Sequence, residues 1–117
     1  MARVIVIVGP TGVGKTKLSV ELAKRLNGEI INADSMQFYK GLDIGTAKIK
    51  EEEKQGVKHH LFDILDVEDD YSIYHYQKDA RVILDNILKQ GKTPIIVGGT
   101  GLYVKALLYD YKTFWNK

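Results

Sequence analysis

Apolar residues in this chain gather in short β-branched runs, and these runs predict strands. Residues 4–8 read Val-Ile-Val-Ile-Val with no polar break, a pattern typical of a strand buried on both faces of a parallel sheet. Similar runs predict strands over residues 29–33 and 93–97, and a weaker run predicts a short strand over residues 60–65. Residues 34–56 carry glycines and a charged run, so loops with short helical turns are expected there.

Between the strands, apolar residues recur every three or four positions, which predicts amphipathic helices. One helix is expected over residues 15–26, a longer one after Ser72 as its N-cap, and a third over residues 102–108. The expected core face of the first helix carries Leu18, Leu22 and Leu26, with Ala23 beside them. The expected core face of the long helix carries Tyr76, Ala80, Ile83, Leu84, Ile87 and Leu88.

Composition narrows the class of protein further. The chain has 117 residues, of which 44% are hydrophobic, enough for the core of one compact domain. Its 17 basic and 15 acidic residues give a net charge of +2, which neither requires nor excludes a nucleic-acid partner. There is no cysteine, which excludes a thiolate metal site and a thiol nucleophile. No run approaches the roughly 20 apolar residues that cross a membrane, so a soluble cytoplasmic protein with no membrane partner is expected.

A glycine-rich motif follows the first expected strand and opens the first expected helix. Residues 9–16 match the pattern G-x-x-x-x-G-K-[ST] in full, and its flanking strand and helix are the context that gives this pattern meaning. Its backbone N–H groups and the helix dipole would hold phosphate oxygens, Lys15 would neutralise them, and the Thr16 hydroxyl could bind Mg²⁺. The motif predicts an α/β fold of the P-loop NTPase type, a three-layer sandwich with a mainly parallel sheet. The predicted diphosphate-binding or nucleotide-binding residues are Gly9, Pro10, Thr11, Gly12, Val13, Gly14, Lys15 and Thr16.

Two further segments lie at the ends of expected strands, where ligands of open α/β sheets bind. Asp34 follows the second strand, and its carboxylate could accept a proton or orient a magnesium-bound water, or simply cap a turn. Residues 98–101 read Gly-Gly-Thr-Gly, which suits either close approach to a ligand or a tight strand-to-helix turn. His59 and His60 are adjacent and would face opposite sides of a strand, so a structural role is favoured for both.

Several longer phrases then resemble one family, the tRNA dimethylallyltransferases, also called tRNA isopentenyltransferases. Besides the P-loop, they are Ile-Asn-Ala-Asp-Ser-Met-Gln-Phe-Tyr-Lys-Gly-Leu-Asp-Ile-Gly-Thr-Ala-Lys at residues 31–48, His-His-Leu-Phe-Asp at 59–63 and Val-Gly-Gly-Thr-Gly-Leu-Tyr at 97–103. The resemblance runs from about Val4 to Leu108. It suggests a P-loop domain over residues 1–110 and a divergent tail over residues 111–117. Family members continue well past this point, so the resemblance also implies that the sheet is incomplete and the chain shortened.

The resemblance implies an alkyl transfer. The P-loop would hold the diphosphate of dimethylallyl diphosphate, with Mg²⁺ on Thr16, and N6 of the adenine next to the anticodon of tRNA would attack the allylic carbon. Asp34 would be the general base and Thr100 a second catalytic residue. Contacts with the tRNA anticodon loop would come from Asp34, Ser35, Met36, Gln37 and Thr100.

Three alternatives remain open from the residues themselves. A small-molecule or nucleoside kinase also uses a P-loop, but it needs arginines over the phosphates, and Arg3, Arg25 and Arg81 all fall on expected strand or helix positions. An isopentenyltransferase acting on free adenine nucleotides would share the site without a tRNA surface. The third alternative is a nucleotide-binding module without catalysis. By the resemblance, the arginines that family members present to diphosphate and tRNA come after residue 117, so weak transfer or none is expected from this chain alone.

Overall fold

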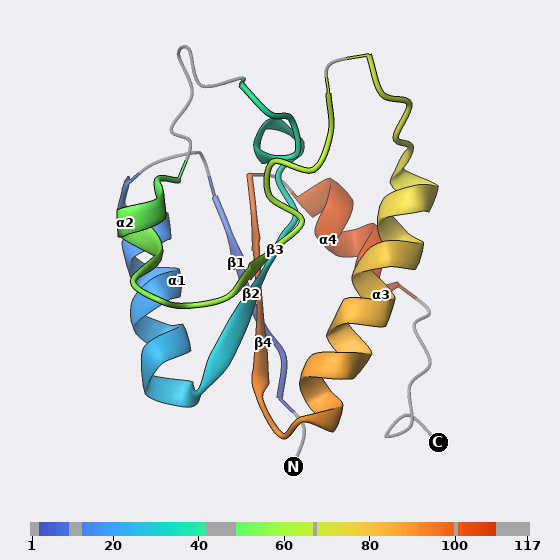
Figure 1. The fold of residues 1–117 in the computed structure, drawn as a ribbon. Helices are drawn as coiled ribbons and strands as arrows, with labels where there is room; N and C mark the ends of the chain where they lie inside the picture. Colours follow the sequence, from blue (N-terminus) through green and yellow to red (C-terminus); the bar gives the residue numbers. More distant parts are fainter. Residues whose placement is uncertain (1–2, 10–12, 42–48, 67, 100, 110–117) are drawn as a thin grey trace.

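The computed structural model describes residues 3–9, 13–41, 49–66, 68–99 and 101–109, which form three layers with a parallel sheet between helices (Figure 1). This confirms the predicted α/β class. The elements in chain order are β1 (Ile5–Val8), α1 (Val13–Leu26), β2 (Gly28–Asn32), the 3-10 helix η1 (Ser35–Gln37), α2 (Glu51–Lys54), β3 (His59–His60), α3 (Ile73–Lys89), β4 (Thr93–Gly98) and α4 (Gly101–Leu108).

The four described strands are hydrogen-bonded in the order β1-β4-β2-β3, and every pair is parallel. Ile30 of β2 lies beside Ile95 of β4, and Ile31 lies beside Ile96. Because successive strand residues point to opposite faces, these two pairs belong to different sides of the sheet. All four isoleucines are buried, with at most 1% of their surface exposed.

One helical layer covers each side of the sheet. On the first side, Val20 and Ala23 of α1 pack against Ile30 and Ile95. On the second side, α3 and α4 pack against Ile31 and Ile96 (Figure 1). The buried residues of α3 are Tyr76, Ala80, Leu84, Ile87 and Leu88, with Ile83 partly buried, so the predicted core face of the long helix is confirmed.

The expected core face of α1 was wrong in one respect. Leu18 is 50% exposed, whereas Ser19 and Val20 are buried together with the expected Ala23. The helix is therefore rotated so that small residues meet the sheet, which brings its backbone close to β2 and β4. Leu22 still packs at the margin of this core.

Two strand predictions also need correction. The run at residues 4–8 was expected to be buried on both faces, yet β1 pairs only with β4 among the described strands, and Val6 and Val8 are 40% and 47% exposed. The strand expected over residues 60–65 is only His59–His60. It ends because Leu61 and Asp63 adopt positive φ angles of 67° and 53°, which no extended strand accommodates.

Candidate functional site

The site forms where β1, β4 and β2 end side by side. The backbone N–H of Gly9, just after β1, donates to the carbonyl of Gly98 at the end of β4, with an N–O distance of 3.2 Å. Helix α1 starts at Val13, so its N-terminus faces the same edge of the sheet and brings the positive end of the helix dipole there. Of the predicted P-loop residues, Pro10, Thr11 and Gly12 lie outside the described residues, as does the side chain of Val13.

Lys15 lies at the centre of this edge. Its Nζ donates to the carbonyl oxygens of Gly9, at 2.7 Å, and Gly98, at 2.9 Å. Burial lowers the pKa of the ammonium group, and the neighbouring Asp34 carboxylate raises it in part. The lysine therefore joins the ends of β1 and β4 while keeping its charge next to Asp34.

Asp34 occupies the end of β2, and its two carboxylate oxygens have different surroundings. Oδ1 accepts a hydrogen bond from the backbone N–H of Met36 at 3.0 Å and so caps η1. Oδ2 faces Gly99, where an added Cβ atom would lie 3.3 Å from it. The capping alternative thus describes Oδ1, while the carboxylate as a whole lies against Gly99, since Oδ1 would be 3.6 Å from the same Cβ atom. A side chain at this position would be a tight fit and would require the Asp34 carboxylate to shift by a few tenths of an ångström.

Asn32 holds Asp34 in place. Its side-chain oxygen accepts from the Asp34 N–H at 2.8 Å, and its Nδ2 donates to the Asp34 carbonyl at 3.0 Å and to the Leu61 carbonyl at 2.9 Å. Asn32 is fully buried, so these bonds satisfy an amide that would otherwise be costly to bury. Asn32 was not among the site residues predicted from the sequence, although a polar side chain at the end of an apolar strand could have indicated its role.

A cavity of about 30 Å³ lies beside these groups, between α1 and the segment that follows β2. Its polar lining includes Lys15, Thr16, Asn32, Asp34 and His59, and its apolar lining includes Ile30, Phe62 and Val97. Gln37 also lines it and is 8% exposed, whereas Met36 is 44% exposed. Of the predicted site residues, Lys15, Thr16, Asp34 and Gln37 are thus brought together, Ser35 and Met36 follow on η1, and Thr100 lies outside the described residues.

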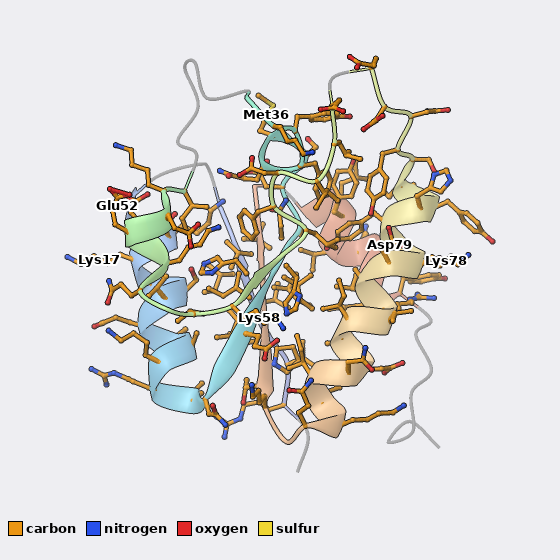
Figure 2. The ribbon with its side chains drawn as sticks, in the orientation of Figure 1. Lys17, Met36, Glu52, Lys58, Lys78 and Asp79 are labelled. Carbon is orange, nitrogen blue, oxygen red and sulfur yellow. The ribbon has the colours of Figure 1, made fainter. Side chains whose placement is uncertain are left out.

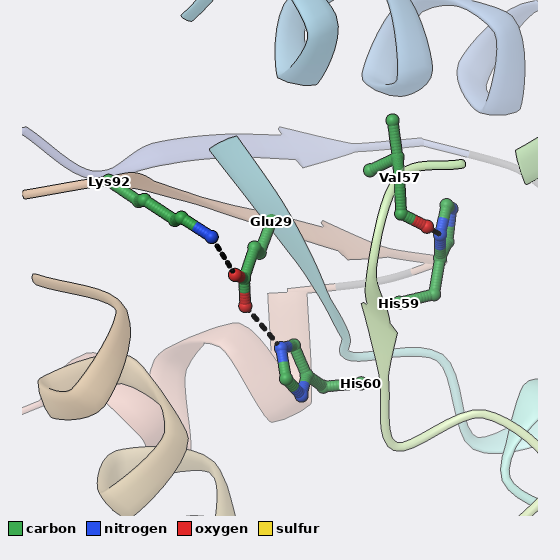
Figure 3. A network of polar contacts seen from close by, with 5 residues as sticks. All are labelled: Glu29, Val57, His59, His60 and Lys92. Atoms are coloured by element: carbon green, nitrogen blue, oxygen red, sulfur yellow. Dashed lines mark hydrogen bonds and ion pairs between the residues drawn. The ribbon is translucent and has the colours of Figure 1, made fainter. Parts of the chain in front are cut away.

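The two adjacent histidines face opposite sides of the sheet, as expected (Figure 3). The ring nitrogen Nδ1 of His59 lies 2.8 Å from the carbonyl oxygen of Val57 on the α1 side. The Nε2 of His60 donates to Glu29 Oε1 at 2.7 Å on the other side, and Lys92 Nζ donates to Glu29 Oε2 at 2.9 Å. His60 is therefore structural, but His59 lines the cavity, which the sequence did not indicate.

The Glu29 carboxylate is buried, with 6% of its side chain exposed. Burial by itself would raise its pKa, but the hydrogen bonds and positive charges of His60 and Lys92 outweigh burial and lower it. These contacts tie β2 to β3 and to the start of β4, at the opposite end of the sheet from Asp34.

Thr16 lines the cavity close to Asp34, so a hydroxyl and a carboxylate, both oxygen donors that suit Mg²⁺, are available on this edge. Among the described residues no group of three or more histidine, cysteine, aspartate or glutamate side chains is arranged to hold a metal. In the described part of the chain, the helices are all too short or too polar to cross a membrane.

Comparison with known proteins identifies relatives over nearly the whole chain. Residues 37–117 match the family model described as IPP transferase. A tRNA dimethylallyltransferase from Anoxybacillus flavithermus is 60% identical over 110 residues, which cover 94% of this chain and 35% of that relative. The chain thus spans about a third of the length of the curated relatives it matches.

Solved structures give the same result. The full-length tRNA isopentenylpyrophosphate transferase from Bacillus halodurans is 53% identical with a TM-score of 0.87, over 96% of this chain and 37% of that one. A eukaryotic dimethylallyltransferase acting on tRNA is 40% identical with a TM-score of 0.86, over 97% of this chain and 28% of that one. The four-stranded parallel sheet and its helices are therefore those of the corresponding part of these enzymes.

Proposed function

Because this chain belongs to the IPP transferase family, we propose that it forms the donor-binding part of a tRNA dimethylallyltransferase. Such an enzyme would move the dimethylallyl group from dimethylallyl diphosphate to N6 of an adenine beside the anticodon, in the cytoplasm where tRNA is found. The chain covers 35% of its relative from Anoxybacillus flavithermus. Its proposed share of the reaction is to bind the diphosphate and to supply the general base.

The observation that carries this proposal is the meeting of Lys15, Asp34 and the Gly98–Gly99 backbone at one edge of the sheet. The Lys15 ammonium and the N-terminus of α1 offer positive charge, which a diphosphate leaving group needs most as its bond to carbon breaks. Asp34 offers an acceptor for the proton that the attacking amine must lose. A site for phosphate beside a carboxylate base suits alkyl transfer to an amine.

The proposed step forms the bond between N6 and the allylic carbon while the bond from that carbon to the diphosphate oxygen breaks. The electron pair of the broken bond leaves with the diphosphate, and one N6 proton passes to Asp34. Magnesium, if bound at Thr16, would add positive charge against the leaving group. The target adenine must leave its stack to reach the site, which costs a few kcal/mol and favours a loop nucleotide.

Calorimetric titration of the chain with inorganic diphosphate in the presence of Mg²⁺ tests the proposed diphosphate site. The Lys15→Ala variant should bind at least about 10-fold more weakly, since a charge-assisted contact to phosphate is lost. Lys17→Ala is the matched control, because Lys17 lies on the same helix and is exposed (Figure 2). Equal loss in both variants, or none in Lys15→Ala, would contradict a diphosphate site at this edge.

A further inference from the structure

His59 presents an unused hydrogen-bond acceptor beside the proposed general base. Its Nδ1 lies 2.8 Å from the Val57 carbonyl oxygen (Figure 3). A carbonyl can only accept, so the proton of the neutral ring is on Nδ1 and Nε2 carries a lone pair. That Nε2 atom is buried and has no hydrogen-bond partner among the residues that the structure describes.

The surroundings of the ring keep it neutral. Burial lowers the pKa of His59, and the hydrogen bond to Val57 and the Glu51 carboxylate offset this only in part, while Lys54 and His60 lower it further. A buried acceptor without a partner costs free energy, so a donor is expected to fill this position in the working state of the site.

The cavity that His59 lines has room for such a donor. Its volume of about 30 Å³ exceeds the roughly 10–15 Å³ that one water molecule needs, so a small polar group such as an amino group can enter it. Asp34 and His59 both line it. The cavity lining therefore includes a carboxylate and a neutral imidazole, two acceptors for a group with two N–H bonds.

We propose that this cavity binds the primary amino group of the acceptor base, with one N–H donated to Asp34 and the other to His59 Nε2. The inference rests on the proposed function, because it names how the same site recognises its nucleophile. During transfer the first N–H bond breaks and its proton passes to Asp34, while the second N–H remains and stays donated to His59. His59 is therefore a catalytic residue that contacts the reacting nitrogen and selects a primary amine.

A selectivity follows from this arrangement. An amine that already carries one substituent has one N–H and can satisfy only one of the two acceptors, and a disubstituted amine satisfies neither. Each lost contact should weaken binding about fivefold, the effect of one ordinary hydrogen bond. The alkylated product would in the same way bind more weakly than the substrate, which helps its release.

Nitrogen NMR of the ¹⁵N-histidine-labelled chain, saturated with inorganic diphosphate and Mg²⁺, tests the inference directly. The probes are adenosine, N6-methyladenosine and N6,N6-dimethyladenosine. Adenosine should shift the His59 Nε2 resonance and bind most tightly, and N6,N6-dimethyladenosine should leave the resonance in place. An unmoved resonance with adenosine, or equal shifts with all three nucleosides, would overturn the proposal and leave water as the partner of Nε2.

Three variants complete the test. His59→Leu should bind adenosine and N6-methyladenosine equally, while His59→Gln, which keeps an acceptor, should retain part of the difference. His60→Gln is the matched control, because His60 faces the other side of the sheet, and it should discriminate like the unchanged chain. Undiminished discrimination in His59→Leu would overturn the proposal. If diphosphate itself does not bind in the first step, the proposed function fails, and the inference fails with it.

Discussion

At the scale of single residues, the geometry of Asp34 depends on a buried amide. Asn32 bonds to both the N–H and the carbonyl of Asp34 and reaches the Leu61 carbonyl across 29 positions in the sequence. These bonds fix the turn that leads from β2 into η1, and with it the direction of the carboxylate. The position of the proposed base is thus set by the buried side chain of a neighbouring residue.

Replacing Asn32 with alanine should lower the free energy of unfolding by about 2–4 kcal/mol, because several buried backbone groups lose their partner. Asn32→Asp should be at least as harmful, since a carboxylate oxygen would face two carbonyls. Urea unfolding measures both changes. Asn86→Ala, at an exposed position of α3, serves as control and should stay within about 0.5 kcal/mol of the unchanged chain. An equally stable Asn32→Ala would show that the turn holds without this amide.

Glu29 predicts a pH dependence of stability. Its pKa in the folded chain is lowered, so the stabilisation that it provides is present above the ordinary carboxyl pKa and is lost as the pH falls through the folded value. Glu29→Gln should therefore be less stable than the unchanged chain by about 1–3 kcal/mol at pH 7, and the gap should close below about pH 4.

Urea titrations at a series of pH values follow this gap. The matched control is Glu52→Gln, because Glu52 is an exposed glutamate on α2 (Figure 2), and it should show a small difference at every pH. A gap for Glu29→Gln that stays constant from pH 7 to pH 3 would mean that the contacts with His60 and Lys92 do not stabilise the fold.

The sequence predicted those site residues whose spacing is local. Lys15 and Thr16 follow from the P-loop motif, and Asp34 follows from its place after a strand. Asn32 and His59 were missed because their roles depend on contacts with chain segments far away in sequence or with a cavity. No local pattern distinguishes His59 from His60, and only the fold shows which of the two faces the site.

At the scale of elements, Arg81 joins α3 to α4 through side-chain hydrogen bonds, in addition to their apolar packing. Arg81 on α3 donates through Nε to the Leu107 carbonyl at 2.9 Å and through Nη2 to the Tyr109 carbonyl at 2.7 Å. Carbonyls at a helix C-terminus lack partners within the helix, so this guanidinium caps α4. Gln77, one turn earlier, adds a bond to the Ala106 carbonyl at 2.7 Å. Arg81 therefore has a structural role.

Arg81→Met should lower stability by about 1–3 kcal/mol and speed amide hydrogen exchange in α4 more than in α1, because the cap of α4 is lost. Arg81→Lys should retain only part of this stability, since an ammonium group lacks the planar set of donors that a guanidinium offers. Lys78→Met on the exposed side of α3 is the matched control (Figure 2). Unchanged exchange in α4 of Arg81→Met would rule out the capping role.

Helices and strands differed in how well their patterns predicted them. The face of α3 follows directly from the helical period of its apolar residues. By contrast, the unbroken apolar run at residues 4–8 does not show whether the strand is covered on both faces. In the structure Val6 and Val8 of β1 are exposed. Strand β3 ends where Leu61 adopts a positive φ angle. Glycine is the residue that usually signals such a conformation, and because this position is a leucine, the sequence did not predict the end of the strand.

At the scale of the whole molecule, every group assigned to the donor site lies at the carboxyl edge of the sheet. The Glu29 network lies at the opposite end, and the α3–α4 contact lies on the face away from α1 (Figure 1). Arg81 and Glu29 thus stabilise the fold from places outside the donor site. Variants that weaken the fold at Arg81 or Glu29 should therefore leave the donor site in the remaining folded molecules unchanged.

If the carboxyl edge of the sheet is a donor site, it binds an allylic diphosphate. Calorimetric titration of the folded chain with dimethylallyl diphosphate and, separately, with ATP, both with Mg²⁺, measures this binding. We expect clear binding of the allylic diphosphate and weaker binding of ATP. Tighter binding of ATP would instead favour a kinase-like site. If circular dichroism shows the chain to be folded and neither ligand binds, these residues do not form a donor site.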